Sequence, residues 1–117
     1  MAVLSRPNPF AASGTLNGAT LVELMPATTG RTYHITKATL SITTHANAKF
    51  VKVQDDAGTP VVVCFHHDLT AAASVPSTVT WDFGESGYSV TAAKAINCVS
   101  EASGVAGIVY VEGYYTV

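Results

Sequence analysis

The cluster of His66, His67 and Asp68 is the first group of residues in this chain that suggests chemistry. Imidazole and carboxylate groups bind divalent metals when they converge on one point. Neighbouring residues of a strand point to opposite faces, so His66 and His67 do not both face one metal while the strand continues. Their spacing also differs from the His-x-His pair of the cupin fold, and nothing in the spacing adds His34 or His45. We expect two polar residues at a strand end and no metal site.

The paired acids Asp55 and Asp56 precede Gly58 in a short turn between two strand-like runs. Asp tolerates tight backbone geometry and Gly supplies a positive φ, so the segment predicts a hairpin turn with solvated carboxylates. A glycosidase pair has to flank a cleft, and the calcium-loop pattern of an EF-hand is absent. The chain has no Gly-x-Ser-x-Gly elbow either. We therefore predict no catalytic residues, no cofactor and no enzymatic activity.

The two cysteines, Cys64 and Cys98, fall inside predicted strands. Free cysteine behaves as a small buried hydrophobe, and this is the interpretation we favour. Neither residue belongs to a Cys-x-x-Cys pair, so zinc or redox use has no support. A disulfide between neighbouring strands is disfavoured in a reducing compartment, although the sequence leaves the pairing of the two cysteines open.

Composition limits the classes of protein to which this chain can belong. Its 117 residues predict one domain, of which 12% are charged and 48% hydrophobic. So few charges indicate surface hidden in a membrane or against copies and partners. No segment has the roughly 18 consecutive apolar residues of a membrane-spanning helix. The first ten residues lack a signal-peptide pattern, so we expect synthesis in a cytoplasm. The net charge of −2 and scattered basic residues argue against direct nucleic-acid binding.

Short apolar runs separated by Gly, Pro, Asn and Asp predict β-strands, because no helical period of useful length occurs. The expected strands are 19–25, 31–44, 48–54, 59–66 and 78–83, followed by two runs within 95–117. In segment 31–44 the inward set changes parity near Thr36 and Lys37, which indicates a bulge or a bend between sheets. Trp81 lies on the apolar face of 78–83 and is the first choice for the core. Counting 31–44 twice gives about eight antiparallel strands and predicts a jelly-roll-like β-sandwich.

Residues 1–17 are predicted to form an extended N-terminal arm, and residues 18–117 the sandwich domain. Pro7 and Pro9 forbid a regular helix in the arm, and the segment from Ala11 to Asn17 is small and polar.

The last two runs, 95–101 and 105–117, flank a Ser-Gly turn and predict a β-hairpin. The second run carries one charge, Glu112, so at most one of its faces is wet. We therefore expect a strand covered on both sides, by a second sheet and by another subunit. Tyr110, Tyr114 and Tyr115 are the candidate oligomer interface, since tyrosine supplies contact area at low entropic cost. A sugar-binding platform is the other interpretation of these aromatic residues.

The segment from Lys94 to Asn97, the turn at Gly104 and the run from Gly107 to Tyr114 resemble small virion proteins of tailed bacteriophages. The likeness covers about the last 35 residues, and it is greatest to the jelly-roll capsid decoration, or cement, proteins. The resemblance implies a homotrimer on the outer capsid that clamps the major capsid protein without chemistry.

In this interpretation the N-terminal arm is a strap onto the shell. Arg6 would supply a charge for pairing and Phe10 an apolar anchor, while Pro7 and Pro9 restrict the backbone. Two alternatives remain open at the level of sequence: a carbohydrate-binding β-sandwich module, and a structural component of a tail or fibre.

Overall fold

The computed structural model describes residues 8–44, 50–67, 77–101 and 105–117, without the side chains of residues 44, 65–67 and 77. These ranges contain nine β-strands and no helix. The strands are Pro9–Thr15 (β1), Val22–Met25 (β2), Thr32–Thr44 (β3), Phe50–Asp55 (β4), Val62–His67 (β5), Ser77–Asp82 (β6), Tyr88–Ser89 (β7), Ile96–Ser100 (β8) and Ala106–Thr116 (β9). The all-β prediction is confirmed.

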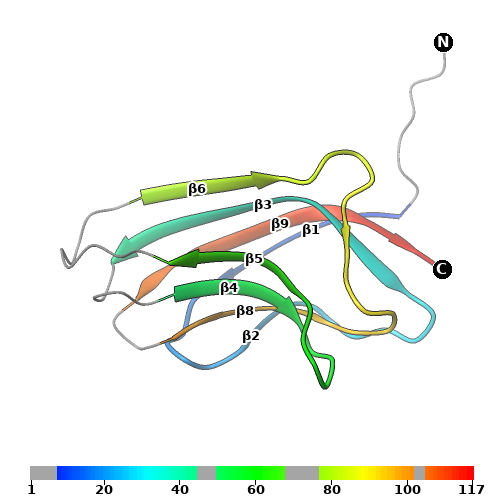
Figure 1. Cartoon of the computed structure of the whole chain (residues 1–117), viewed down its shortest axis with the longest axis horizontal. Coiled ribbons are helices and arrows are strands. Elements are labelled where there is room, and N and C mark those ends of the chain that lie inside the picture. Colours follow the sequence, from blue (N-terminus) through cyan, green and yellow to red (C-terminus); the bar gives the residue numbers. More distant parts are fainter. Residues whose placement is uncertain (1–7, 45–49, 68–76, 102–104) are drawn as a thin grey trace, which may run out of the picture.

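Two antiparallel sheets form a sandwich (Figure 1). The large sheet has the order β1-β9-β3-β6, with the short β7 paired to β3, and the small sheet has the order β2-β8-β4-β5. The pairing is nested along the chain: β4 pairs with β5, β3 with β6, β2 with β8 and β1 with β9. A long hairpin folded over on itself in this way is the jelly roll, so the predicted fold is confirmed.

The predicted C-terminal hairpin is wrong, because its two strands lie in different sheets. β8 pairs with β2 and β4, whereas β9 pairs with β1 and β3. Turn residues are a local signal and do not determine which sheet the following strand enters. The other predicted hairpin is confirmed, since β4 and β5 pair directly across the turn after Asp55.

The parity switch predicted in segment 31–44 is confirmed as a bulge within β3. The register against β9 shifts between Ile35 and Lys37, and the strand stays in the large sheet. Tyr33, Ile35, Ala38, Leu40 and Ile42 all point into the core and are at most 2% exposed. The extra residue at the bulge lets one strand keep its apolar side chains inward on both sides of the shift.

The prediction that residues 1–17 form an extended arm is wrong for Pro9–Thr15, which is an edge strand of the large sheet. Pro9 occupies the first position of that strand, where proline is tolerated. The small residues of the segment serve close packing. A Cβ on Gly14 would lie 2.8 Å from Leu24 and 3.0 Å from Val22 of β2. Residues 1–7 lie outside the described part of the chain.

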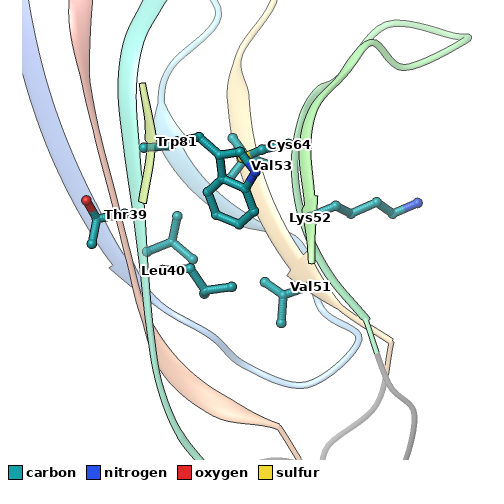
Figure 2. A pocket seen from close by; sticks show the side chains of 9 residues that line it. Thr39, Leu40, Val51, Lys52, Val53, Cys64 and Trp81 are labelled. Carbon is teal, nitrogen blue, oxygen red and sulfur yellow. The ribbon is translucent and has the colours of Figure 1, made fainter. Parts of the chain in front are cut away.

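Trp81 lies on β6, at the open side of the sandwich, and packs against the core while remaining half-buried. Its indole reaches between the sheets, with Leu40 on one side and Val51 and Val53 on the other (Figure 2). A gap of about 10 Å³ remains beside it, room for roughly one water molecule. Trp81 is therefore at the margin of the core, and most of the fully buried hydrophobic residues lie on β3, β8 and β9.

Candidate interaction surface

The acid pair of the β4–β5 turn, Asp55 and Asp56, has a structural role. Asp55 was expected to be solvated, but it is 0% exposed. Its Oδ1 accepts hydrogen bonds from the amides of Ala57 (3.1 Å) and Val61 (2.9 Å), and its Oδ2 accepts one from the amide of Thr91 (2.8 Å). Asp56 Oδ1 accepts a further bond from the Ala95 amide at 2.9 Å. The pair holds the turn against the loop before β8.

Burial raises the pKa of Asp55, but hydrogen bonds from Thr91, Val61 and Ala57 outweigh it and hold the pKa below its ordinary value. A general acid needs the opposite shift, towards the working pH. The carboxylate is thus a charged acceptor at neutral pH in the folded protein, which fits a structural role.

The cysteines match the prediction of small buried hydrophobes. Both are free and buried, with exposed fractions of 6% for Cys64 and 0% for Cys98. Burial raises the pKa of Cys64 to about 12 and that of Cys98 to about 11. They flank Val53 on the strands either side of β4, so their Cα atoms are about 10 Å apart. A disulfide needs less than about 7 Å, so the fold keeps them unpaired.

The histidines give no metal centre in the described residues, where no group of three His, Cys, Asp or Glu side chains converges. His66 and His67 belong to β5, but their side chains lie outside the described part, as do His45 and Asp68.

His34 serves instead as a junction in the large sheet. Its Nδ1 lies 2.7 Å from Ser89 Oγ and its Nε2 lies 2.9 Å from Thr116 Oγ1. Its ring stacks on Tyr114 with 4.6 Å between centroids. The side chain therefore ties together the ends of β3, β7 and β9.

The three tyrosines predicted as an interface do not share a face, because 115 has the opposite parity to 110 and 114. Tyr115 packs against the core, with the Arg31 guanidinium 4.1 Å from its ring centroid. Tyr114 is 9% exposed and donates a hydrogen bond to the Ser86 carbonyl at 2.8 Å. Tyr110 is 37% exposed on the outer face of the large sheet. Of the three, Tyr110 offers the most accessible ring.

Tyr110 lies within an uncharged patch on that outer face, which we call the hydroxyl face. The strand register aligns two rows of residues there, Ser13–Tyr110–Thr39–Thr80 and Thr15–Ile108–Ser41–Thr78. Ile108 is 51% exposed near its centre, and all eight side chains are exposed or half-buried. The next row towards β7 contains Glu112, Lys37 and Asp82, so the charges of this face begin at its border.

The chemistry of the hydroxyl face suits contact with another protein surface. Lys and Glu are depleted at interface cores and tyrosine is enriched, while serine is depleted as well, so the exposed Ile108 and Tyr110 are the residues of this face that best suit a contact. Hydroxyl groups both donate and accept hydrogen bonds, so the patch can satisfy a partner of the same kind. The sequence contained a signal for this division. Alternate residues of a strand point to opposite faces, so Ile108 and Tyr110 share a face that Tyr115 does not.

The predicted strap residues are distributed differently. Arg6 and Pro7 lie outside the described residues, while Pro9 and Phe10 belong to β1. The Phe10 ring meets Tyr33 edge-on, with 5.4 Å between centroids, and packs against the core. Phe10 therefore stabilises the sandwich, and the expectation that it anchors a free strap is corrected.

No helix among the described residues has the length and apolar character needed to cross a membrane. No protein-family model matches the chain, and no curated protein matches it.

Proposed function

We propose that this chain is a non-enzymatic structural protein of a bacteriophage virion, a capsid decoration protein that binds the outer shell as a homo-oligomer. The observation that carries the proposal is the hydroxyl face on a jelly-roll sandwich. Eight outward residues on four adjacent strands carry no charge, and Ile108 and Tyr110 are exposed among them. An oligomer that covers this face would remove the apolar surface of Ile108 and Tyr110 from water.

The rest of the molecule supports a binding role over a chemical one. The acids that suggested catalysis are used to hold a turn, and the thiols are buried with raised pKa values. The sequence resemblance to cement proteins adds the expected partner, the major capsid protein, and the expected trimer. Many weak contacts on one particle then give lasting attachment through multivalency.

A pair of matched lysine substitutions tests the proposal. Ile108→Lys places a charge on the hydroxyl face, and Val62→Lys places one on the small sheet, where Val62 is 39% exposed. We expect sedimentation to show that the parent protein and Val62→Lys are oligomers, and that Ile108→Lys dissociates. A monomeric parent protein at micromolar concentration contradicts the oligomer, and dissociation by Val62→Lys alone places the contact on the other sheet.

Attachment is measured on shells assembled from the major capsid protein encoded in the same genome, without this chain. We expect the parent protein to co-sediment with the shells and to raise the temperature at which they break. Absence of binding to shells, with the oligomer intact, contradicts the capsid role and leaves the tail or fibre as the virion location to test.

A carbohydrate-binding role has one observation in its favour. Tyr88 is 41% exposed, and its ring meets that of Phe83 edge-on with 5.8 Å between centroids, so two aromatic side chains lie together there. The Tyr114 ring lies on the other face of the sheet and is covered by His34, so it offers no second platform. Binding on a glycan array that Tyr88→Ala abolishes would establish this function instead.

A further inference from the structure

Strand β1 forms one edge of the large sheet, and its outer backbone has no partner among the described residues. The Asn8 carbonyl accepts a hydrogen bond from the Tyr115 amide at 3.0 Å, and the Leu16 amide donates to the Gly107 carbonyl at 2.9 Å. Alternate residues of an antiparallel strand bond to the same neighbour. The even-numbered residues of β1 therefore face β9, and the odd-numbered residues direct their backbone groups out of the sheet.

The outward backbone groups of β1 form a regular row along the strand. The amides of Ala11, Ser13 and Thr15 point outward, together with the carbonyls of these residues and of Pro9. Pro9 lacks an amide, but it stands at the first position and protects that end alone. The seven residues of β1 contain no charge.

The other edge strands, β2, β5 and β6, each carry some protection against pairing, and in β5 this is a register shift against β4 between Val53 and Gln54. β2 has four residues, an irregular register between Glu23 and Met25, and an exposed acidic side chain at Glu23. β6 ends at the exposed Asp82. Short length, bulges and charges are the devices by which natural sheets avoid edge-to-edge association. Their absence from β1 points to an edge that is used.

We propose that β1 pairs antiparallel with β1 of a second copy about a two-fold axis, which joins two large sheets into one continuous sheet. The edge is self-complementary, because three outward amides on each copy meet three outward carbonyls on the other. The side chains on the outer face of β1, those of Ala11, Ser13 and Thr15, are small and uncharged. Two identical strands therefore approach without steric or electrostatic conflict.

The inner side of β1 prepares this edge for pairing. Phe10 packs on Tyr33, and Gly14 lies against Leu24 and Val22. These contacts hold β1 in place within a single copy of the protein. Little backbone order has to be acquired on association. This contact goes beyond the proposed function, which uses the hydroxyl face. In a cyclic oligomer built on that face, the β1 contact would link neighbouring oligomers.

Amide hydrogen exchange over a range of protein concentrations tests the proposal on the full chain. The amides of Phe10, Ala12 and Gly14 face β9 and should be protected at every concentration. Those of Ala11, Ser13 and Thr15 should exchange rapidly when dilute and become protected as sedimentation shows association. Rapid exchange in the associated protein overturns the proposal, and so does protection that is independent of concentration.

Substitutions at the edge provide the second test. Ser13→Pro removes an amide that the large sheet does not use, and by symmetry it deletes two bonds of the contact. Its association should weaken by about tenfold or more, while Ser13→Ala stays within about twofold. The variant Ala11→Lys leaves the backbone and the hydroxyl face intact, because Ala11 lies in the charged row beside Glu112. It should also weaken pairing, with exchange at Ala12 and Gly14 reporting that the strand still folds. Normal pairing in this variant contradicts the proposal.

Two further variants separate this contact from the others. Deletion of residues 1–7 should leave the concentration-dependent protection unchanged, and its loss would assign the contact to those residues. Ile108→Lys should dissociate the oligomer of the proposed function while the protection of Ser13 and Thr15 persists. If protection of the β1 edge disappears together with the hydroxyl-face contact, β1 has no contact of its own and the proposal is wrong.

Discussion

The carboxylate of Asp55 and the amide of Thr91 are joined by a hydrogen bond of 2.8 Å across 36 positions of the chain. The bond connects the β4–β5 turn to the loop that leads into β8. Because Asp55 is 0% exposed, its charge depends on this bond and on the amides of Ala57 and Val61. Asp55 therefore contributes strongly to the stability of that end of the sandwich.

Asp55→Asn should destabilise the protein by about 2–4 kcal/mol, because a neutral amide replaces a charged acceptor and turns a donor towards backbone amides. Asp56→Asn is the matched control. Its side chain is exposed and accepts one bond from Ala95, so the cost should be below about 1.5 kcal/mol. Urea unfolding measures both, and equal costs would show that burial of Asp55 is not what matters.

The same carboxylate predicts how stability depends on pH. The pKa of Asp55 is lowered in the folded protein from its ordinary value of 3.8, so its contribution is fully present above that value. The contribution is lost as the pH falls through the lower folded pKa. Melting temperatures between pH 6 and pH 2 should therefore fall more steeply below about pH 4. Asp55→Asn should flatten that acid limb, and an unchanged limb would assign the acid sensitivity to other groups.

Both thiols should be inert in the native protein. Burial raises the pKa of Cys64 to about 12 and of Cys98 to about 11, so neither thiolate is populated at pH 8. A thiol reagent should react with both cysteines in denaturant and with neither in the native state within minutes. Mass spectrometry should find no disulfide after mild oxidation. Rapid native labelling of either residue would mean that the strands of the small sheet open.

Two glycines give a matched test of the β3 bulge. Gly113 is opposite Ile35, and a Cβ there would collide with the carbonyl oxygen of His34. Gly113→Ala should therefore cost about 3 kcal/mol or more, since a backbone atom cannot move aside without disturbing the ladder. A Cβ on Gly58 meets nothing within 4 Å, so Gly58→Ala should change stability by less than about 1 kcal/mol. Thermal unfolding compares the pair.

Trp81→Ala should destabilise the sandwich by about 2–3 kcal/mol, less than for a fully buried tryptophan, because the indole is half-exposed at the sheet edge. Its fluorescence should be quenched in part by acrylamide in the native state. Full protection from the quencher would place the ring deeper than the structure does, and an unchanged melting temperature would show that it contributes no packing.

Local patterns predicted the parts of this fold that depend on neighbours in sequence. The parity switch near Thr36 identified the bulge, and the acids before Gly58 identified the one hairpin. Which sheet each strand enters depends on distant partners, so the placement of β1 and β9 was beyond such patterns. The burial of Asp55 also depends on a distant partner, because its hydrogen-bond donor Thr91 lies far along the chain, so local patterns did not predict it.

The place of β9 between β1 and β3 also sets an order of events in folding. β1 has β9 as its ladder partner among the described strands, and residues 9–15 meet residues 108–114. During synthesis the first strand therefore waits, unpaired, until nearly a hundred later residues have been made. Such distant contacts fold slowly and leave apolar strands open to other chains meanwhile. The large sheet thus cannot close before β9 has left the ribosome, and the yield of this protein in the cell depends on what happens in that interval.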